Sequence, residues 1–549
     1  MFLLLLPVFA FAQNIPPGQE PGAESERFRK ESEQKKIDLE KKKAKAPEIQ
    51  VEEEKAPPTP EGQSFLLNDV KVTGSTIFKP EDFKPLYENF IGKKVTYREL
   101  DFIINKIKDK YKGKSYLTTS AFLPEQEVKN GVVEIRIIEG KMGELKIEGN
   151  KYFSTPLIKK YFHLKKNDLL SIQTLQRDIL RLNQNSDLEL KATIAKGGAP
   201  ETTDVILKAT EKLPYHAGLS VDNQGTRLVG KYRESLTLRS SNLTGNLDSL
   251  FINTLYSGRS FGESVSYTLP IGTNGTKFGL DITYFRMKLG EEYKPNDITG
   301  ETQDYTPHVS WELALSEDYQ ANLDVGLEIK SIIKRTSGSQ TSDDQLRLPY
   351  FGLNFSKMDN YGQTTFAPKM VFGTSGFMGA SSRNHPSASR ANTGGEFYKY
   401  EQYLGRIQRM PFGSYISARS QLQLASRTLP SSEQLQLGGA NTIRGYPEGD
   451  YLADWGGYIS TDWVLSKLMV PSLRGKIEPV VFADVGGGEL KKVLPGEKHM
   501  KFLAGVGGGL RMHLNNTASL RLDWAQYVGD EPFGGNGPST FYFSFQSEI

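Results

Sequence analysis

The feature that most constrains the fold is an alternation of apolar and polar residues that runs from residue 214 to the C-terminus. Successive side chains of a β-strand point to opposite faces, so a strand with this pattern has one apolar and one polar face. Residues 319–330 are the clearest case, and residues 415–424 repeat the pattern. The apolar positions of the first segment are Ala321, Leu323, Val325, Leu327 and Ile329. The larger, C-terminal part of the chain is therefore expected to be all β.

We count 16 candidate strands, the first beginning near Tyr215 and the last near Ser539. A stack of soluble β-sandwiches would also contain alternating strands, but an even number of strands of about 10 residues favours a closed transmembrane barrel. The chain contains 53 Gly, 29 Phe and 25 Tyr, which suits a barrel with tight turns and aromatic girdles. We predict a 16-stranded antiparallel transmembrane β-barrel over residues 214–549, wide enough for an aqueous channel.

The composition argues against an enzyme, a metal site or a nucleic-acid partner. The 68 basic and 65 acidic residues leave a net charge of +3, and no cysteine is present to form a disulfide, a thiolate metal site or a nucleophile. The six histidines lack metal-ligand spacing, and no G-x-S-x-G motif occurs. The glycine-rich residues 505–509 lack the Lys-Ser or Lys-Thr of a phosphate loop, so we attribute them to smooth curvature of the barrel wall. We expect no catalytic residue, no cofactor and no metal.

The N-terminal residues indicate secretion and then a charged linker. Residues 1–12 hold an apolar run that ends in Ala-Phe-Ala, the pattern of a signal-peptide cleavage site. Residues 13–63 are rich in Glu, Lys and Pro, and within them residues 23–46 could form a helix. Such a helix cannot bury a core of its own, because its only large apolar residues are Phe28, Ile37 and Leu39. It could be a solvated linker or a removable plug, because a polar helix suits a water-filled lumen.

Between the linker and the predicted barrel lies an internal repeat. Residues 71–78 (K-V-T-G-S-T-I-F) match residues 146–153 (K-I-E-G-N-K-Y-F) at an offset of 75 residues. The element order predicted for both copies is β-α-α-β-β. The sequence therefore predicts two small α+β domains, over residues 64–140 and 141–213.

The elements of the two copies follow from capping and periodicity. In the first copy, Thr96 and Glu99 form a capping box that starts a helix, whose apolar stripe is Leu100, Ile103, Ile104, Ile107 and Tyr111. We expect the other elements of this copy at residues 66–73, 80–90, 115–122 and 132–138. In the second copy we expect the five elements at residues 145–148, 155–162, 171–184, 188–195 and 204–210. In the helix expected at residues 171–184, the side chains of Leu175, Ile179 and Leu182 should face inward.

Two further segments point to an interaction inside the barrel. Residues 437–446 (L-G-G-A-N-T-I-R-G-Y) belong to a long loop, and residues 477–486 alternate so that Asp484 shares the polar, inner face of its strand. A guanidinium on a loop that folds inward can form a bidentate pair with such a carboxylate. We predict that Arg444 pairs with Asp484. The alternative is that Arg444 is a solvated loop arginine.

These segments carry a resemblance to a known family. Ile443-Arg444-Gly445-Tyr446 resembles the V-R-G-Y/F loop signature of the two-partner secretion transporters, with isoleucine in place of the commoner valine. The segment from Phe482 through Asp484 to Gly486 (F-A-D-V-G) resembles the F-x-D-x-G strand motif of the same family. The repeats resemble POTRA (polypeptide-transport-associated) domains, and residues 122–126 (F-L-P-E-Q) and 132–140 (V-V-E-I-R-I-I-E-G) are similar to the hemolysin-transporter type. The resemblance extends from about residue 64 to the end.

The resemblance implies a function in the bacterial outer membrane. Members of the family export one large hemolysin- or adhesin-like exoprotein from the periplasm to the cell surface, without nucleotide hydrolysis. It implies that the periplasmic POTRA domains capture the unfolded substrate, that the barrel is the pore, and that Arg444 and Asp484 hold the loop in the conformation needed for transport. The implied partners are the exoprotein, outer-membrane lipid and the barrel-assembly machinery. Two alternatives remain, a general barrel-insertion factor and a passive porin.

Overall fold

The computed structural model describes residues 15–40, 49–51, 64–391, 393–470, 475–514, 517–533 and 537–549. The predicted signal peptide lies outside these residues. The chain divides into two compact units, one within residues 42–213 and the other formed by the residues up to 41 together with 214–549. Each unit is described below by itself.

The capping box and the apolar stripe predicted for the first repeat are both present in the structure. Helix α3 (Tyr97–Lys112) begins at the capping box of Thr96 and Glu99, and all five residues of the predicted stripe are buried. The helix expected at residues 80–90 is instead three short pieces, because Pro80 and Pro85 have no N–H and can only begin a helical turn. These pieces are η2 (Pro80–Asp82), α2 (Lys84–Tyr87) and η3 (Glu88–Phe90).

One strand of the first repeat, β6 (Val132–Ile138), has the expected bounds, but the others are shorter than expected. The segment predicted as one strand over residues 66–73 is divided between two strands that belong to different sheets. β2 (Ser64–Leu66) pairs with β4 (Lys94–Thr96), whereas β3 (Asp69–Thr73) pairs with β6. β5 (Ser120–Phe122) covers only the end of the strand expected at residues 115–122. The main sheet has the order β3-β6-β5.

The second repeat follows the expected order closely. Its elements are β7 (Lys141–Glu148), α4 (Thr155–Lys160), α5 (Ile172–Asn183), β8 (Leu188–Lys196) and β9 (Thr202–Glu211). One strand was not predicted: β1 (Ile49–Val51), from the linker, lies parallel to β8 at the edge of the sheet, which has the order β1-β8-β9-β7.

The shared motif of the repeats is a glycine turn capped by a glutamate. Gly74 and Gly149 both have a left-handed φ, of 86° and 82°, and a Cβ at either would lie within 3 Å of a backbone carbonyl oxygen of a neighbouring strand. In the first copy Glu139 accepts hydrogen bonds from the N–H groups of Thr76 (2.9 Å) and Ile77 (3.1 Å). Glu211 caps the matching turn of the second copy.

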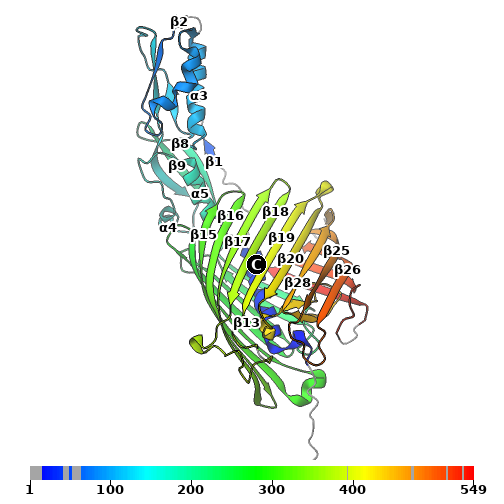
Figure 1. Ribbon diagram of the computed structural model, residues 1–549. Helices are drawn as coiled ribbons and strands as arrows, with labels where there is room; N and C mark the ends of the chain where they lie inside the picture. Colours follow the sequence, from blue (N-terminus) through cyan, green and yellow to red (C-terminus); the bar gives the residue numbers. More distant parts are fainter. Residues whose placement is uncertain are drawn as a thin grey trace, which may run out of the picture. The chain divides into compact units, whose positions relative to one another are not determined.

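The C-terminal unit is a closed antiparallel barrel, as predicted (Figure 1). Its described strands number sixteen when β23 and β24, which both pair with β25, are counted as one. β15, β16 and β17 are longer than the expected strands of about 10 residues. The strands are β10 (Tyr215–Asp222), β11 (Arg233–Ser240), β12 (Ser249–Ser257), β13 (Ser260–Ile271), β14 (Thr276–Lys288), β15 (Ile298–Leu315), β16 (Tyr319–Thr336), β17 (Ser339–Asp359), β18 (Gly362–Phe372), β19 (Tyr398–Arg409), β20 (Tyr415–Ala425), β23 (Trp455–Val464), β24 (Leu468–Val470), β25 (Gly475–Glu489), β26 (Met500–Leu514), β27 (Ala518–Tyr527) and β28 (Ser539–Glu548). Among the described helices, none is long and apolar enough to cross a membrane.

The barrel closes where β10 meets β28. This seam contains five residue pairs, from Gly218 opposite Glu548 to Asp222 opposite Ser544. The side chain of Asn223 then extends the seam, because its amide donates to the carbonyl oxygen of Phe541 (2.8 Å) and accepts from the N–H of Phe543 (2.8 Å).

Helix α1 (Pro21–Glu40), preceded by η1 (Pro17–Gln19), belongs to the barrel unit. Figure 1 shows this N-terminal segment in blue among the barrel strands. The helix contacts β13, β14, β15 and β16 and the short helix η7 (Ser431–Glu433). The residues predicted as helical beyond residue 40 lie outside the described part of the chain.

Candidate functional site: an inward loop, the barrel wall and helix α1

The long loop between β20 and β23 is folded back against the barrel wall. It contains η7 and a short hairpin formed by β21 (Leu435–Leu437) and β22 (Tyr451–Ala453). Between the two strands of the hairpin lies the predicted motif, and Arg444 at its centre is 0% exposed. A completely buried arginine requires compensating charge, because an unpaired buried charge is very costly.

Asp484 of β25 supplies that charge. The Arg444 guanidinium donates to Asp484 through Nε to Oδ2 (2.7 Å) and Nη2 to Oδ1 (2.7 Å), and the Arg444 backbone N–H donates to the same carboxylate (3.0 Å). The guanidinium also lies over the ring of Phe482, with its Cζ 3.5 Å from the ring centroid. The structure therefore brings the predicted partners together in a bidentate geometry, and Arg444 is not a solvated arginine.

Two other aspartates and two other arginines complete the cluster. Arg444 Nη2 donates to Asp462 of β23 (2.5 Å), and its Nη1 lies 3.7 Å from Asp523 of β27. Asp523 also accepts from Arg511 (2.5 Å) and Arg521 (2.7 Å). Three guanidinium groups thus face three carboxylates, and the positive charge of Arg419 also acts on Asp462. Sequence reasoning missed Asp462 and Asp523, although their positions on inner strand faces were a usable signal.

The other motif residues form the packing around the ion pair. Ile443 and Tyr446 are buried in one apolar cluster. Gly486 leaves space for this cluster, because a Cβ there would lie 2.8 Å from Ile443 Cδ1. Gly445 has a φ of 97° and donates its N–H to the hydroxyl of Tyr542 (3.2 Å). Each motif residue thus helps to hold the loop against the wall.

The glycine run of β26 has a different cause from the one we expected. A Cβ at Gly505 would lie 1.9 Å from the carbonyl oxygen of Arg444, and a Cβ at Gly507 would lie 2.5 Å from the ring of Phe482. These positions are therefore glycine because the loop and its aromatic support approach the wall closely. At Gly505 and Gly507, this close approach gives a reason for glycine that differs from the smooth curvature we expected for the run.

Helix α1 contacts the inner wall mainly through charged groups. Lys330 of β16 is buried and lies 3.1 Å from Glu26 of the helix, 2.8 Å from Glu328 and 2.8 Å from Glu433 of η7. Further along the helix, Glu31 pairs with Arg233 of β11 (2.8 Å). The helix is thus joined to the wall at several points along its length.

The helix also has an apolar contact that its sequence did not lead us to expect. Phe28 is buried in a cluster of wall and loop residues, and its ring lies 5.8 Å from that of Phe285. Two wall glycines provide the necessary space, because a Cβ at Gly262 would lie 2.8 Å from the Phe28 ring and one at Gly300 would lie 2.4 Å from Pro21. Although it has no core of its own, the helix shares one with the barrel.

The same helix contacts the loop that carries Arg444. Asn441 donates to the Glu31 carboxylate (3.2 Å), and Gln436 donates to the carbonyl oxygen of Ala23 (2.6 Å). Glu448 of the loop accepts the N–H of Ala440 (2.8 Å). Burial raises the pKa of Glu448 to about 7, although the positive charge of Arg27 on the helix acts in the opposite direction. The helix and the loop therefore form one connected structure.

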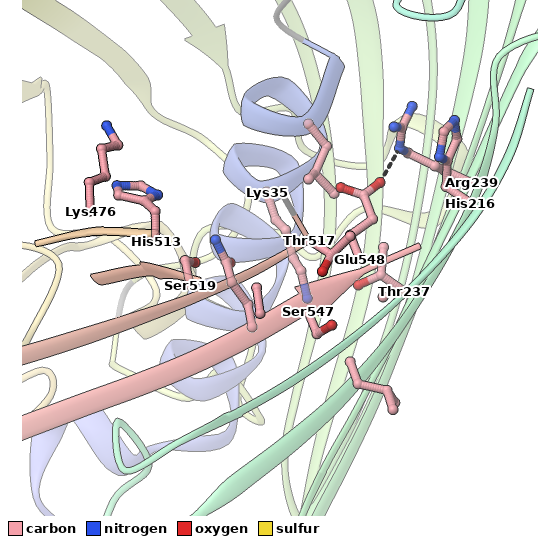
Figure 2. A pocket seen from close by; sticks show the side chains of 15 residues that line it. Lys35, His216, Thr237, Arg239, Lys476, His513, Thr517, Ser519, Ser547 and Glu548 are labelled. Atoms are coloured by element: carbon pink, nitrogen blue, oxygen red, sulfur yellow. Dashed lines mark hydrogen bonds and ion pairs between the residues drawn. The ribbon is translucent and has the colours of Figure 1, made fainter. Parts of the chain in front are cut away.

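A cavity of about 490 Å³ remains beside the C-terminal half of α1, at the end of the barrel where β10 begins. Figure 2 shows its lining, with Arg239 joined to Glu548 and with His216, Lys476 and His513 also labelled. Lys35 of the helix contributes to the same lining. The cavity is therefore rich in basic side chains.

The chain matches two known protein-family models. Residues 201–512 match the family model for the haemolysin secretion/activation protein ShlB/FhaC/HecB, and residues 65–140 match that for the ShlB-type POTRA domain. The heme/hemopexin transporter protein HuxB of Haemophilus influenzae is 24% identical over 488 residues, which cover 85% of this chain and 84% of that protein. The outer membrane transporter CdiB of Dickeya dadantii is 23% identical over 447 residues, covering 78% of this chain and 77% of that protein.

Solved structures share the fold. The structure of CdiB from Escherichia coli superposes with a TM-score of 0.75 at 19% identity, covering 98% of this chain and all of that one. BamA from Haemophilus ducreyi, solved without its POTRA domains 1–3, gives a TM-score of 0.52 at 13% identity and covers 88% of this chain and 100% of that one. The family match spans more than half of the chain. The chain belongs to the haemolysin secretion/activation protein family ShlB/FhaC/HecB, and it is an outer-membrane transporter of the two-partner secretion type with its POTRA domains in the periplasm.

Proposed function

We propose that this transporter exports one large hemolysin- or adhesin-like exoprotein, unfolded, through the lumen of the barrel. The observation that carries the proposal is the occupied lumen, in which α1 and the Arg444 loop are held by charged groups that water could replace when the lumen opens. A passive porin would have no use for the two α/β repeats. The family match favours export over general barrel insertion, because its members are named for secretion.

In this proposal Arg444 and Asp484 lock the loop in the conformation that transport requires. The pair is bidentate, completely buried and supported by Phe482. Charge-assisted bidentate pairs combine strength with a fixed orientation, which suits a lock better than apolar packing alone. Loss of the lock should therefore stop export while the strands of the barrel still assemble.

The POTRA domains capture the exoprotein before it reaches the barrel. An exposed strand edge offers unpaired N–H and C=O groups to an extended chain, and such pairing tolerates varied side chains. In the first repeat β5 is an edge strand, and Phe122 at its end is 38% exposed. In the second repeat β1 already lies along β8, so a substrate at that edge would have to displace residues 49–51.

Helix α1 acts as a removable plug, and the remaining partners are outer-membrane lipid and the barrel-assembly machinery. The helix fills space inside the ring of strands and is fixed mainly by ion pairs, which can be exchanged for water at little net cost compared with an apolar core. The apolar outer face of the barrel, with residues such as Val481 and Val485 exposed, suits lipid.

Export is tested by producing the full chain in a Gram-negative host together with a candidate exoprotein, a long secreted repeat protein from the same genome. We expect the exoprotein in the medium only when both are present, and in the periplasm when the transporter is absent. Release of the exoprotein without the transporter would contradict the proposal. Defects in unrelated outer-membrane proteins on loss of the transporter would instead favour a general insertion factor.

A further inference from the structure

One cationic group of the cavity beside α1 forms no direct ion pair with a described residue. The lining residues of the cavity carry three full positive charges, on Lys35, Arg239 and Lys476, and one negative charge, on Glu548. Arg239 pairs with Glu548 (2.7 Å), and Lys476 pairs with Glu478, which lies just beyond the lining (2.7 Å). Two of the three cations are thereby neutralised.

Lys35 is the third. Its ammonium group donates to the hydroxyl of Ser220 (3.2 Å) and to the amide oxygen of Asn253 (3.3 Å), both of which are neutral. Among the described residues, no carboxylate oxygen lies within ion-pair distance of it. The neighbouring Lys36 differs, since it lies 3.9 Å from Asp281 and hydrogen-bonds to Ser266. Burial lowers the pKa of Lys35 to about 8, although the negative charges of Asp222, Glu548 and Glu31 act in the opposite direction.

The other groups of the lining suit an anion. The imidazole rings of His216 and His513 can donate hydrogen bonds, and His513 lies 3.3 Å from Glu478. The hydroxyls of Thr237, Ser519 and Ser547 are donors that impose no fixed geometry on a ligand. A volume of about 490 Å³ lies within the range of ligand sites and exceeds the space that a single small ion needs.

The position of the cavity indicates which anion arrives there. It lies on the inner side of the strands, where membrane lipid has no access, and at the periplasmic end, where β10 follows the second repeat. We propose that this cavity binds an acidic side chain of the entering exoprotein, with Lys35 as its cationic partner. The proposal rests on the export function and names the chemical class of the segment that engages the barrel first.

Such binding has a consequence for the helix. A carboxylate at Lys35 competes with Ser220 and Asn253, so α1 loses two contacts with the wall when the substrate is bound. The contact of Lys36 with Ser266 is not affected. The arrival of the substrate would therefore loosen the C-terminal half of the plug.

The test measures binding of fluorescein-labelled hexaglutamate to the purified full chain in detergent by fluorescence anisotropy. We expect salt-dependent binding that Lys35→Gln weakens about tenfold, because a charge-assisted hydrogen bond contributes about 1.5 kcal/mol. Lys36→Gln is the matched control, since it removes the same charge from the same helix outside the cavity, and we expect less than about a twofold change. Lys476→Gln, on the wall, should also weaken binding without disturbing α1.

Each of the following results would count against the proposal. Equal losses in Lys35→Gln and Lys36→Gln would mean that only net charge matters, and no loss in Lys476→Gln would mean that Lys35→Gln acts by displacing the helix. Equally strong binding of hexaglutamine, or displacement by equimolar inorganic phosphate, would exclude a site for acidic side chains of a polypeptide. A transporter that exports its exoprotein but does not bind hexaglutamate would refute this site alone, whereas binding without export would refute the proposed function alone.

Discussion

The lock between Arg444 and Asp484 can be tested quantitatively through the substitution Arg444→Ala. This change removes a completely buried guanidinium, so that Asp484 loses its bidentate partner while Asp523 keeps its ion pairs with Arg511 and Arg521. Breaking a buried ion pair by removing one partner costs about 3–5 kcal/mol. At about 1.4 kcal/mol per factor of ten, the equilibrium between the seated and released loop should shift by roughly 10² to 10³.

The absence of cysteine makes this shift measurable. A single cysteine at Ala440, which is 0% exposed in the seated loop, should react with a soluble maleimide only when the loop is released. We expect its labelling rate in the Arg444→Ala background to rise by the same factor of roughly 10² to 10³. Secretion should be lost in this variant, while the folded barrel is still recovered from outer membranes.

Arg427→Ala is the matched control in the same loop. Arg427 is 44% exposed and lies 3.9 Å from Glu396, so its loss should cost less than about 1 kcal/mol and alter labelling less than about fivefold. Arg444→Lys should give an intermediate rate, since lysine keeps the charge but cannot form the bidentate pair. If Arg444→Ala labels no faster than Arg427→Ala and still secretes normally, the ion pair does not lock the loop.

The remaining predictions concern the plug, its pH dependence and the first repeat. Deletion of residues 23–46 should raise single-channel conductance in planar bilayers, because the ring of strands then lacks α1, and an unchanged conductance would leave the segment a linker. Burial raises the pKa of Glu448 to about 7, so the structure in which it is buried is favoured most below the unperturbed pKa of about 4.3 and loses this stabilisation as pH rises through 7. As pH is raised from 5 to 8, channel openings should therefore become more frequent in the full chain but not in Glu448→Gln. If both proteins respond to pH in the same way, a group other than Glu448 causes the response. Glu139→Gln should weaken the cap over Thr76 and Ile77 by about 1–3 kcal/mol, seen as faster hydrogen exchange of these two amides, and unchanged exchange would show that the carboxylate is dispensable.

The barrel could be predicted from sequence because its signal is repeated in every strand. Alternation of side chains depends on one residue and its neighbours, and the first and last strands, β10 and β28, begin at Tyr215 and Ser539 as expected. The same rule placed Asp484 on the inner face of β25, where it is buried while Ala483 and Val485 are exposed. The helix α3 followed from its capping box and its apolar stripe, both of which are local.

The features that escaped prediction depend on residues that are distant in sequence. Asp523 is important because β27 lies beside β26, which carries Arg511, and no local pattern reveals that neighbour. Likewise, Gly505 is explained only by the Arg444 carbonyl oxygen that approaches it. Three residues of β1 give too short a pattern to predict a strand, and their pairing with β8 depends on an edge more than a hundred residues away. Phe28 could be recognised as an anchor only after the wall around it was known.

The seam between β10 and β28 sets the order in which the barrel can be completed. Its hydrogen bonds join residues more than 300 positions apart, as between Asn223 and Phe541, so they can form only after the whole C-terminal sequence has been delivered. Pairing at such separation is slow, and until it occurs both terminal strands present open edges to other chains. A folding intermediate with all its hairpins formed and its circumference still open is therefore expected to persist. The side chain of Asn223 contributes two of the final hydrogen bonds, so replacement of this residue should prolong the open state most.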